Sequence, residues 1–176
     1  PSPRHFTTLP TGLTGRLKRH GIEPVLVVVN ESIETILSLV NSYGFTTVQL
    51  HGSEPSEICR LLRQQGLTLI KAFAIASEKD FKETTYYADC CDFFLFDTRT
   101  LLPGGSGNSF DWDCLNAYKG PVRFFLSGGI QPDDSDRILA LQHPFLYAVD
   151  LNSRFEATPG IKDPTLLADF ITRLRH

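Results

Sequence analysis

Short apolar runs alternate with helix-like segments along most of the chain. The first run, residues 25–29, reads Val-Leu-Val-Val-Val, and an uninterrupted apolar strand of this kind predicts burial on both faces, as in a parallel sheet. Asn30 follows it and is a residue type that can cap a helix. Apolar residues then recur at helical spacing over 33–40, and Gly44 favours the end of that helix.

The same strand-and-helix unit repeats to the end of the chain. Further strands are predicted over 46–50, 67–73, 93–96, 122–126 and 146–149. Helices are predicted over 54–65, from Glu78 after a cap at Ser77, over 111–118 after a cap at Asp111, over 132–141 with Pro132 at the start, and over 165–174, with a weakly helical segment over 11–20. Strands that alternate with helices in this way predict a parallel sheet.

A parallel sheet leaves two architectures, an open doubly wound sheet and a barrel. No GxGxxG or Walker sequence follows the first strand, which weakens the dinucleotide and nucleotide interpretations. The ends of the last two strands favour the barrel, because both carry small polar residues. These are Ser127-Gly128-Gly129 after Leu126, and Asp150-Leu151-Asn152-Ser153 after Val149.

In TIM barrels a phosphate commonly binds on the loops after strands seven and eight. Glycines there let backbone N–H groups approach the anion. A Gly-Gly pair by itself is equally a tight turn, but the same chemistry at two adjacent strand ends favours phosphate. The predicted fold class is therefore α/β, a (β/α)8 TIM barrel of which six β/α units are visible, forming one domain over residues 1–176.

Other strand ends supply candidate catalytic and binding groups. Asp97 directly follows an apolar strand, so it lies at the rim where barrel catalysis occurs and is a candidate general acid or base; it equally fits a loop cap. His51 follows another strand and either contacts substrate or makes a structural hydrogen bond. The long loop 98–110 contains Gly104-Gly105-Ser106-Gly107 and is either a lid or a surface insertion.

Composition excludes several classes of function. Of 176 residues 41% are hydrophobic and the net charge is -3, with no basic stripe, so we expect one globular domain and no nucleic-acid partner. Apolar runs are too short to span a membrane. Four cysteines without CxxC spacing predict reduced packing thiols, no structural metal and a cytoplasmic protein.

Taken in order, these motifs resemble the phosphoribosylanthranilate isomerase family of tryptophan biosynthesis. The resemblance runs from residue 1 to the end and also includes Ser2-Pro3-Arg4 and Val29-Asn30-Glu31. Its main motifs are Val48-Gln49-Leu50-His51-Gly52, Phe96-Asp97-Thr98, Gly104-Gly105-Ser106-Gly107, Phe110-Asp111-Trp112, Leu126-Ser127-Gly128-Gly129, and Val149-Asp150-Leu151-Asn152-Ser153 with Glu156, Pro159-Gly160 and Lys162-Asp163.

The resemblance implies an Amadori rearrangement without a cofactor, in which phosphoribosylanthranilate becomes the corresponding 1-deoxyribulose phosphate. A general acid protonates the furanose ring oxygen, a Schiff base forms, and a general base takes the C2 proton. Asp97 matches the family's acid. The matching substrate and phosphate positions are Arg4, His51, Gly105, Ser106, Gly107, Ser127, Gly128, Gly129, Asp150, Asn152 and Ser153. The expected partner is a small phosphorylated substrate, and the expected state is a monomer or homodimer.

One departure from the family pattern concerns the general base. The family begins with a strand ending in Lys-x-Cys-Gly, whose cysteine is the base, and this sequence begins later, at Ser-Pro-Arg. None of its four cysteines follows a predicted strand. We therefore expect a domain that is incomplete at its N-terminus, and residues 1–176 alone to lack full turnover.

Two alternatives remain from the sequence. One is a non-catalytic phosphate-binding fragment that pairs with another chain. The other is a different phosphate-binding barrel, such as a sugar-phosphate epimerase or indole-glycerol-phosphate synthase. Such enzymes use different strand-end acids or a catalytic lysine, and Lys71, inside a predicted strand, is the candidate lysine.

Overall fold

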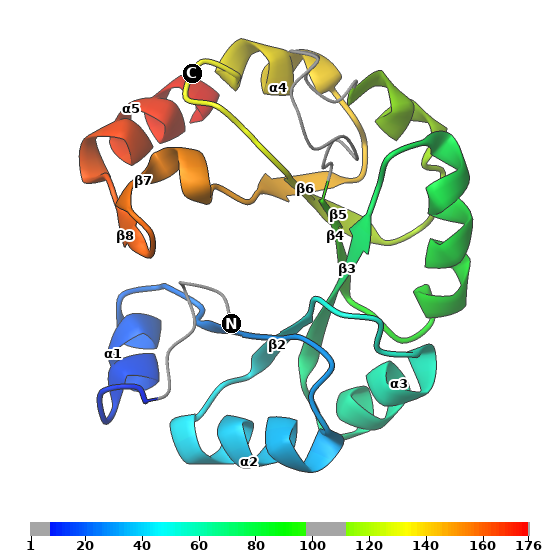
Figure 1. Cartoon of the computed structure of the whole chain (residues 1–176), viewed down its shortest axis with the longest axis vertical. Coiled ribbons are helices and arrows are strands. Elements are labelled where there is room, and N and C mark those ends of the chain that lie inside the picture. The colour runs from blue at the N-terminus through cyan, green and yellow to red at the C-terminus, as the bar shows by residue number, and fades with distance from the viewer. Residues whose placement is uncertain (1–7, 98–111, 176) are drawn as a thin grey trace.

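A computed structural model describes residues 8–97 and 112–175. The described residues contain one six-stranded sheet in the order β1-β2-β3-β4-β5-β6, and every neighbouring pair is parallel (Figure 1). All six predicted strands are confirmed, with ends that shift by one residue at most. Their bounds are β1 Val25–Val28, β2 Thr47–Leu50, β3 Thr68–Ala74, β4 Phe93–Asp97, β5 Arg123–Ser127 and β6 Leu146–Val149.

The helices form an outer ring around the curved sheet (Figure 1). Each strand is followed by a helical segment on the same side, which is the arrangement of a β/α barrel. A short antiparallel hairpin, β7 (Glu156–Thr158) with β8 (Ile161–Lys162), was not predicted. The helical segments are α1 Leu13–Arg19, α2 Ile33–Tyr43, α3 Ser56–Gln64, η1 Glu78–Tyr87, η2 Trp112–Ala117, α4 Ser135–Leu141, η3 Ser153–Phe155 and α5 Pro164–Arg175.

Two predicted helix starts are wrong. Ser32, not Asn30, caps α2 by accepting a hydrogen bond from Thr35 N at 3.2 Å. Asn30 has a left-handed backbone, φ 54°, and its side chain accepts from Ser53 N at 2.7 Å. Pro132 does not open α4 either, because the Asp134 carboxylate accepts from Gln131 N and turns the chain first.

The two faces of the sheet have different partners. The face toward the helices carries the main core, which includes the buried side chains of Leu69, Phe73, Phe94, Phe96 and Phe124. The inner, concave face carries a smaller cluster made of Ile70, Ala72 and Leu95, with Phe93 and Phe125 packed against it. Because side chains alternate between faces along a strand, Asp97 and Ser127 point to the inner face at the ends of β4 and β5.

The prediction that residues 25–29 are buried on both faces is wrong. Val25, Val27 and Val29 are 37%, 56% and 58% exposed, while Val28 on the helix side is 5% exposed. Among the described residues β1 pairs only with β2, so it is an edge strand of the sheet. Its other edge has no strand beside it, and the side chains on its inner face are exposed. An uninterrupted apolar run therefore predicts burial of both faces of a strand only when the strand has a neighbouring strand on each side.

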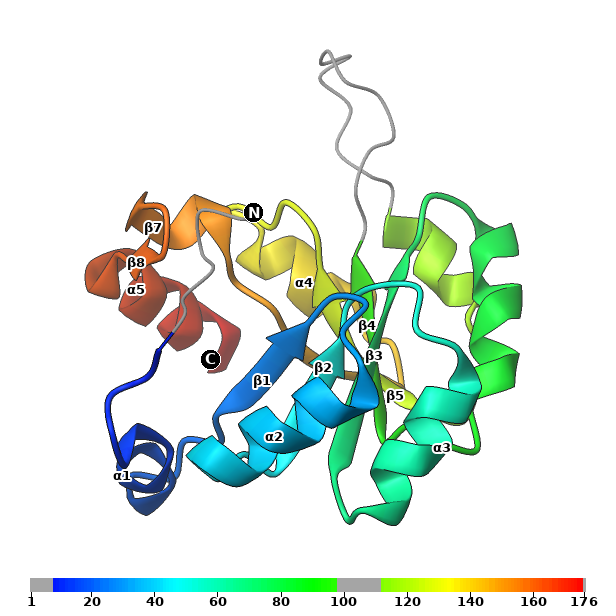
Figure 2. The same cartoon turned by 60° about the horizontal axis from the view of Figure 1, so that its bottom comes forward.

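Strand register brings the functional strand ends together. Asp97 lies opposite Ala74 on β3 and opposite Ser127 on β5, and the backbone N–H of Asp150 donates to Leu126 O at 2.8 Å. All strands run the same way, so their carboxyl ends share one edge, the upper edge in Figure 2. Within the described residues, no helix combines the length and apolar character needed to cross a membrane.

Candidate active site

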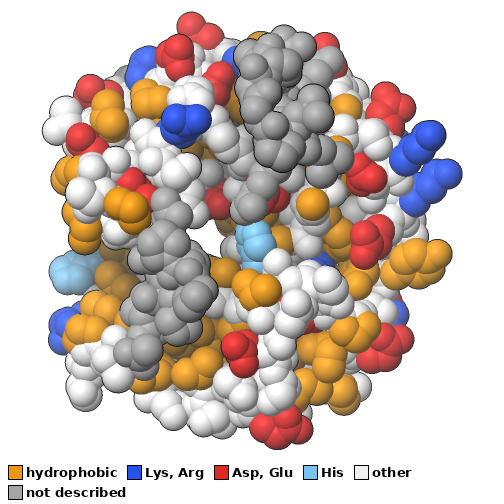
Figure 3. All heavy atoms as spheres, viewed as in Figure 1, with side chains coloured by type: hydrophobic (Ala, Val, Ile, Leu, Met, Phe, Trp, Pro, Cys, Tyr) orange, Lys and Arg blue, Asp and Glu red, His pale blue; other side chains and the backbone are white. Residues whose placement is uncertain are grey.

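A pocket of about 210 Å³ lies at the carboxyl edge of the sheet. The same face is hollowed near its centre, where histidine and acidic side chains are visible (Figure 3). Eight residues predicted from sequence line this pocket together with Ile130 and Arg154. The eight are His51, Asp97, Ser127, Gly128, Gly129, Asp150, Asn152 and Ser153. Residues from His51 to Arg154, about 100 positions apart in the chain, thus meet in one site.

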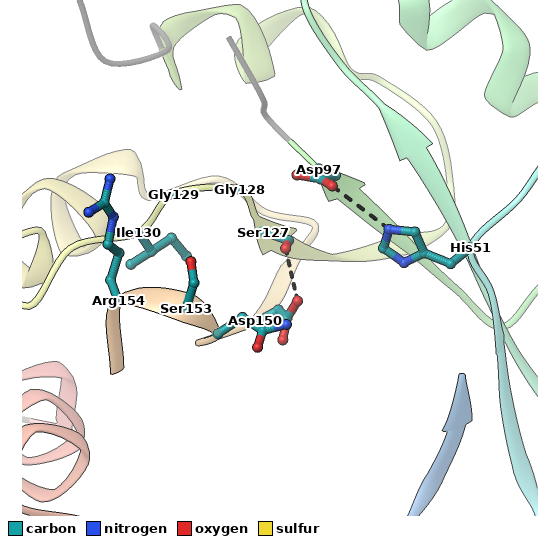
Figure 4. Close-up of a pocket in the computed structure, with 10 residues that line it drawn as sticks. His51, Asp97, Ser127, Gly128, Gly129, Ile130, Asp150, Ser153 and Arg154 are labelled. Atoms are coloured by element: carbon teal, nitrogen blue, oxygen red, sulfur yellow. Dashed lines mark hydrogen bonds and ion pairs between the residues drawn. The ribbon is translucent and has the colours of Figure 1, made fainter. Parts of the chain in front are cut away.

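Asp97 and His51 form one end of the pocket (Figure 4). Their Oδ2 and Nε2 atoms are 3.8 Å apart, and Asp97 is only 7% exposed. The Gln49 amide nitrogen lies 2.8 Å from His51 Nδ1. Since an amide nitrogen can only donate, Nδ1 is the acceptor and the neutral ring carries its proton on Nε2, facing Asp97. Gln49 thereby orients a donor toward the carboxylate.

Ser127 and Asp150 form the floor between the two ends. Ser127 Oγ donates to Asp150 Oδ2 at 2.8 Å, and Ser127 is 7% exposed. The chain then turns at Gly128 and Gly129, whose φ values are 98° and 68°. Only glycine adopts this left-handed backbone readily, so the glycine pair is required for the turn whatever it binds.

The loop after β6 forms the other side of the pocket and is anchored from below. Lys162 Nζ, on β8, donates to Leu151 O, Asn152 Oδ1 and Glu156 Oε1, each at 3.0 Å. The carboxylate of Glu156 is 4% exposed. This cluster holds the backbone of Asn152 and Ser153 in place, and the hairpin that supplies Lys162 is therefore part of the support of the site.

Ile130 and Arg154 are the two pocket residues that the sequence reasoning missed, and Arg154 is the charged one. Arg154 is therefore the more important of the two for an anionic ligand. It lies at the end of the pocket away from His51, beside Ser153 and Ile130 (Figure 4). An arginine fork matches the oxygen geometry of a phosphate group. The sequence feature that could have identified Arg154 is its position, directly after Asn152 and Ser153 in a loop already predicted to bind phosphate.

Four predicted site residues, Arg4, Gly105, Ser106 and Gly107, lie outside the described residues. Lys71, the candidate of the alternative barrel enzymes, is not at the pocket. Its side chain is 3% exposed on the helix side of β3, where Nζ lies 3.3 Å from Glu54 Oε2. That placement removes Lys71 as the candidate catalytic lysine of the alternative barrel enzymes.

The cysteines also lie away from the pocket. Cys59 is in α3, Cys90 and Cys91 precede β4, and Cys114 is in η2. The prediction that they are packing thiols is confirmed: the first three are buried, and Cys114, which is partly exposed, packs against the main core. None of the four lines the pocket.

The fold and the pocket define a class: an enzyme of the β/α-barrel type, with an acid–histidine pair at one end of its site and a glycine turn with an arginine at the other. Comparison with known proteins gives the family. A family model described as N-(5'-phosphoribosyl)anthranilate isomerase matches residues 14–173. The chain belongs to the N-(5'-phosphoribosyl)anthranilate isomerase family, which are isomerases of tryptophan biosynthesis.

Individual proteins similar to this chain belong to the same family. The N-(5'-phosphoribosyl)anthranilate isomerase of Parabacteroides distasonis is 45% identical over 150 residues, covering 85% of this chain and 68% of the relative. That of Phocaeicola vulgatus is 41% identical and covers 99% of this chain and 83% of the relative. The crystal structure of the Thermotoga maritima enzyme superposes with a TM-score of 0.73 at 34% identity, covering 88% of this chain and 73% of that one.

Proposed function

We propose that this protein rearranges N-(5'-phosphoribosyl)anthranilate to 1-(2-carboxyphenylamino)-1-deoxyribulose 5-phosphate, and that the pocket at the carboxyl edge is where it does so. Family membership gives the reaction. The observation that carries the assignment of the site is the layout of the pocket, which separates a proton donor from an anion-binding end (Figure 4). A related structure contains the reduced product analogue, with a TM-score of 0.71 and 31% identity.

Asp97 is the general acid of this proposal. In its protonated form it donates a proton to the furanose ring oxygen, the ring C–O bond breaks, and a Schiff base forms at C1. Loss of the C2 proton then gives the enolamine, which tautomerises to the aminoketose. The buried position of Asp97 on the inner face, beside the Nε2–H of His51, suits this role because a positioned acid accelerates proton transfer.

His51 positions and partners the acid. Its Nε2–H faces the Asp97 carboxylate formed after proton donation, so it stabilises the charge that develops there. Gln49 fixes the ring for this purpose. A cysteine is the base in the family pattern, and no cysteine within residues 1–176 lines the pocket, so the proposal assigns none of them to this step.

The phosphate binds at the end formed by the two loops after β5 and β6. Gly128 and Gly129 let the backbone approach an anion closely, and Ser153 and Arg154 supply a hydroxyl and a cation. The Asp150 carboxylate accepts a hydrogen bond from Ser127 Oγ. This contact keeps the negative charge of Asp150 directed to the floor of the pocket. Binding energy from the phosphate then positions the sugar at Asp97.

Conversion of N-(5'-phosphoribosyl)anthranilate by the protein in its natural form tests the proposal, with inorganic phosphate as a competing ligand. We expect conversion, and competitive inhibition by phosphate. Binding of phosphate with no conversion favours the non-catalytic alternative, and conversion of a different sugar phosphate favours another barrel enzyme. Either result contradicts the proposal.

Replacing Arg154 by alanine is expected to raise KM for the phosphorylated substrate about tenfold and to leave kcat within about twofold. The reason is that a charge-assisted contact to the phosphate contributes about 1.5–3 kcal/mol when well formed, and 1.4 kcal/mol is tenfold. Arg154 is exposed, so the lower end applies. Steady-state kinetics at constant ionic strength measure the effect.

Arg175→Ala is the matched control, because it removes the same charge from the last turn of α5, outside the pocket. An unchanged KM in Arg154→Ala shows that Arg154 does not bind the phosphate. An equal rise in Arg175→Ala shows that Arg154 acts through the general field and not by contact.

The protein's oligomeric state and location complete the proposal. We place it in the cytoplasm as a monomer or homodimer, acting on a small phosphorylated molecule without nucleic acid. Both states have a precedent in one relative, since the solved structures include monomers generated from the dimeric Thermotoga maritima enzyme.

A further inference from the structure

Three cysteine sulfurs meet at the end of the sheet opposite the active site. Cys59 comes from α3, and Cys90 and Cys91 come from the segment between η1 and β4. Their Sγ atoms all lie within 4.8 Å of one another. The three residues are 0%, 1% and 4% exposed. Sequence spacing hides this trithiol cluster (Cys59, Cys90 and Cys91), because Cys59 is more than 30 positions from the other two.

The backbone around the trithiol cluster is fastened on both sides. Arg60 forms hydrogen bonds with both carboxylate oxygens of Asp89, and Arg63 Nη1 donates to Asp89 O at 2.9 Å. Asp92 accepts from Leu69 N at 2.9 Å through its side chain and donates to Leu69 O at 3.0 Å through its backbone. These contacts join α3, β3 and the segment 89–92. The positions of the three thiols are therefore set by hydrogen bonds that neighbouring residues make.

The thiols make only weak hydrogen bonds of their own. Cys59 Sγ lies 3.9 Å from Pro55 O, and Cys90 Sγ lies 3.5 Å from Tyr87 O. A thiol is a weak donor, so little is lost when these contacts are replaced by bonds to a metal. A hydrogen bond from Cys91 and the nearby Lys71 ammonium lower the pKa of the Cys59 thiol, against burial and the Glu54 charge. Burial raises the pKa of the Cys90 thiol to about 11, and the hydrogen bond with Cys59 together with burial raises the pKa of the Cys91 thiol, so metal binding has to displace these two protons.

The candidate metal ligands of the trithiol cluster are three cysteine sulfurs, which are soft ligands. Among the described residues, no histidine or carboxylate joins the three sulfurs within the same distance of one another. Zinc in structural sites takes four ligands in a tetrahedron, whereas thiolates also select Cu(I). A metal bound at about 2.3 Å from each of three sulfurs places them about 4 Å apart. That spacing lies within the limit of the cluster.

We propose that Cys59, Cys90 and Cys91 bind one soft monovalent metal ion, Cu(I), in a three-sulfur site. Binding replaces the thiol S–H bonds by S–Cu bonds and releases the protons to solvent, and no electron is transferred. Lys71 on β3 and Arg60 on α3 lie near enough to act on the thiols electrostatically, so they offset part of the negative charge that remains.

One member of the trithiol cluster, Cys91, borders a second pocket at the surface. This pocket is also lined by Arg63, Asp92 and Phe93 from one side and Val122 and Arg123 from the other. Apart from Arg63 in α3, these residues lie at the amino ends of β4 and β5, whereas the active-site pocket is at their carboxyl ends. The metal site is thus separate from the isomerase chemistry, and its success or failure leaves the proposed function untouched.

A Cu(I) titration of the fully reduced protein under anaerobic conditions tests the proposal. A chromogenic Cu(I) chelator competes for the ion, and ultraviolet thiolate-to-copper charge transfer reports binding. We expect one equivalent of Cu(I) to be withheld from the chelator, with three sulfur neighbours by X-ray absorption. Zn(II) at the same concentration should displace less than a tenth of it.

The variants Cys59→Ala and Cys91→Ala are expected to weaken Cu(I) binding at least tenfold. Cys114→Ala is the matched control, since Cys114 is the remaining cysteine of the chain and lies outside the cluster; it should bind as the unmodified protein does. Circular dichroism and a cooperative urea unfolding transition show that each variant is folded. Cys90→Ala provides a third variant if one of the first two does not fold.

Three results overturn the proposal. They are undiminished Cu(I) binding in folded Cys59→Ala and Cys91→Ala, loss of binding in Cys114→Ala, and equal binding of Zn(II) and Cu(I) by the unmodified protein. Fewer than three sulfur neighbours in the absorption spectrum equally contradict a three-sulfur site.

Discussion

Replacing Asp97 by asparagine is expected to lower kcat of the isomerase by about 10²- to 10⁴-fold, the usual contribution of a positioned general acid. The amide has nearly the same shape and cannot supply the proton that opens the furanose ring. KM should change little, because the phosphate end of the pocket is formed by other residues. Steady-state kinetics on the purified variant measure both values.

The matched control is Asp89→Asn, an identical chemical change at an exposed carboxylate that pairs with Arg60 near the opposite rim. It should leave kcat unchanged. A decrease of less than about tenfold in Asp97→Asn contradicts the role of general acid. In that case Asp97 serves to orient His51, and the proton comes from elsewhere.

His51→Ala separates the two functions of the pair. If His51 only supports Asp97 across the 3.8 Å contact, its loss lowers kcat less than the loss of Asp97 does, and the double variant is no slower than Asp97→Asn alone. Residues that act as a unit are non-additive in this way.

The sequence predicted the strands and the rim of the site because both depend on short-range patterns. Buried strands need consecutive apolar residues, and the carboxyl ends of parallel strands share one edge. Asp97, Ser127 and Asp150 could therefore be placed at one rim without knowing any distance. The same reasoning does not extend to Arg154, because a lone arginine in a polar loop is usually solvated.

Contacts between distant segments were beyond the reach of sequence patterns. Asn30 has the residue type of a helix cap, yet its side chain binds Ser53 N on the neighbouring loop. The trithiol cluster likewise depends on how α3 packs against the start of β4. The exposure of Val27 could not be read from its own strand, because it is set by what lies beside β1.

Lys71 is the strongest example of such a contact. Its place in β3 indicated burial but not on which face of the sheet. In the structure Nζ donates to Gly52 O at 2.7 Å and to Ala72 O at 3.1 Å, and it pairs with Glu54 Oε2 at 3.3 Å. Glu54 in turn accepts from the backbone N–H groups of Asn30 and Gly52. The ion pair thus joins the loops after β1 and β2 to β3.

Lys71→Met is expected to lower the free energy of unfolding by about 3–5 kcal/mol, the usual cost of breaking a buried ion pair by removing one partner. Both side chains are 3% exposed, so water cannot solvate the carboxylate that remains. Methionine keeps most of the volume and the contact with the Phe73 and Tyr87 rings, over which Nζ lies at 5.5 and 5.7 Å. Urea unfolding followed by circular dichroism measures the change.

A double-mutant cycle isolates the ion pair from the packing. Adding Glu54→Gln to Lys71→Met removes the unpaired charge while keeping an acceptor for Gly52 N, so the double variant should be more stable than Lys71→Met alone. Arg60→Ala breaks an exposed pair with Asp89 and should have a much smaller effect, because surface ion pairs contribute little. If Lys71→Met unfolds at the same urea concentration as the unmodified protein, the pair does not hold the loops beneath the active site, and the position of His51 depends on Gln49 and the strand register alone.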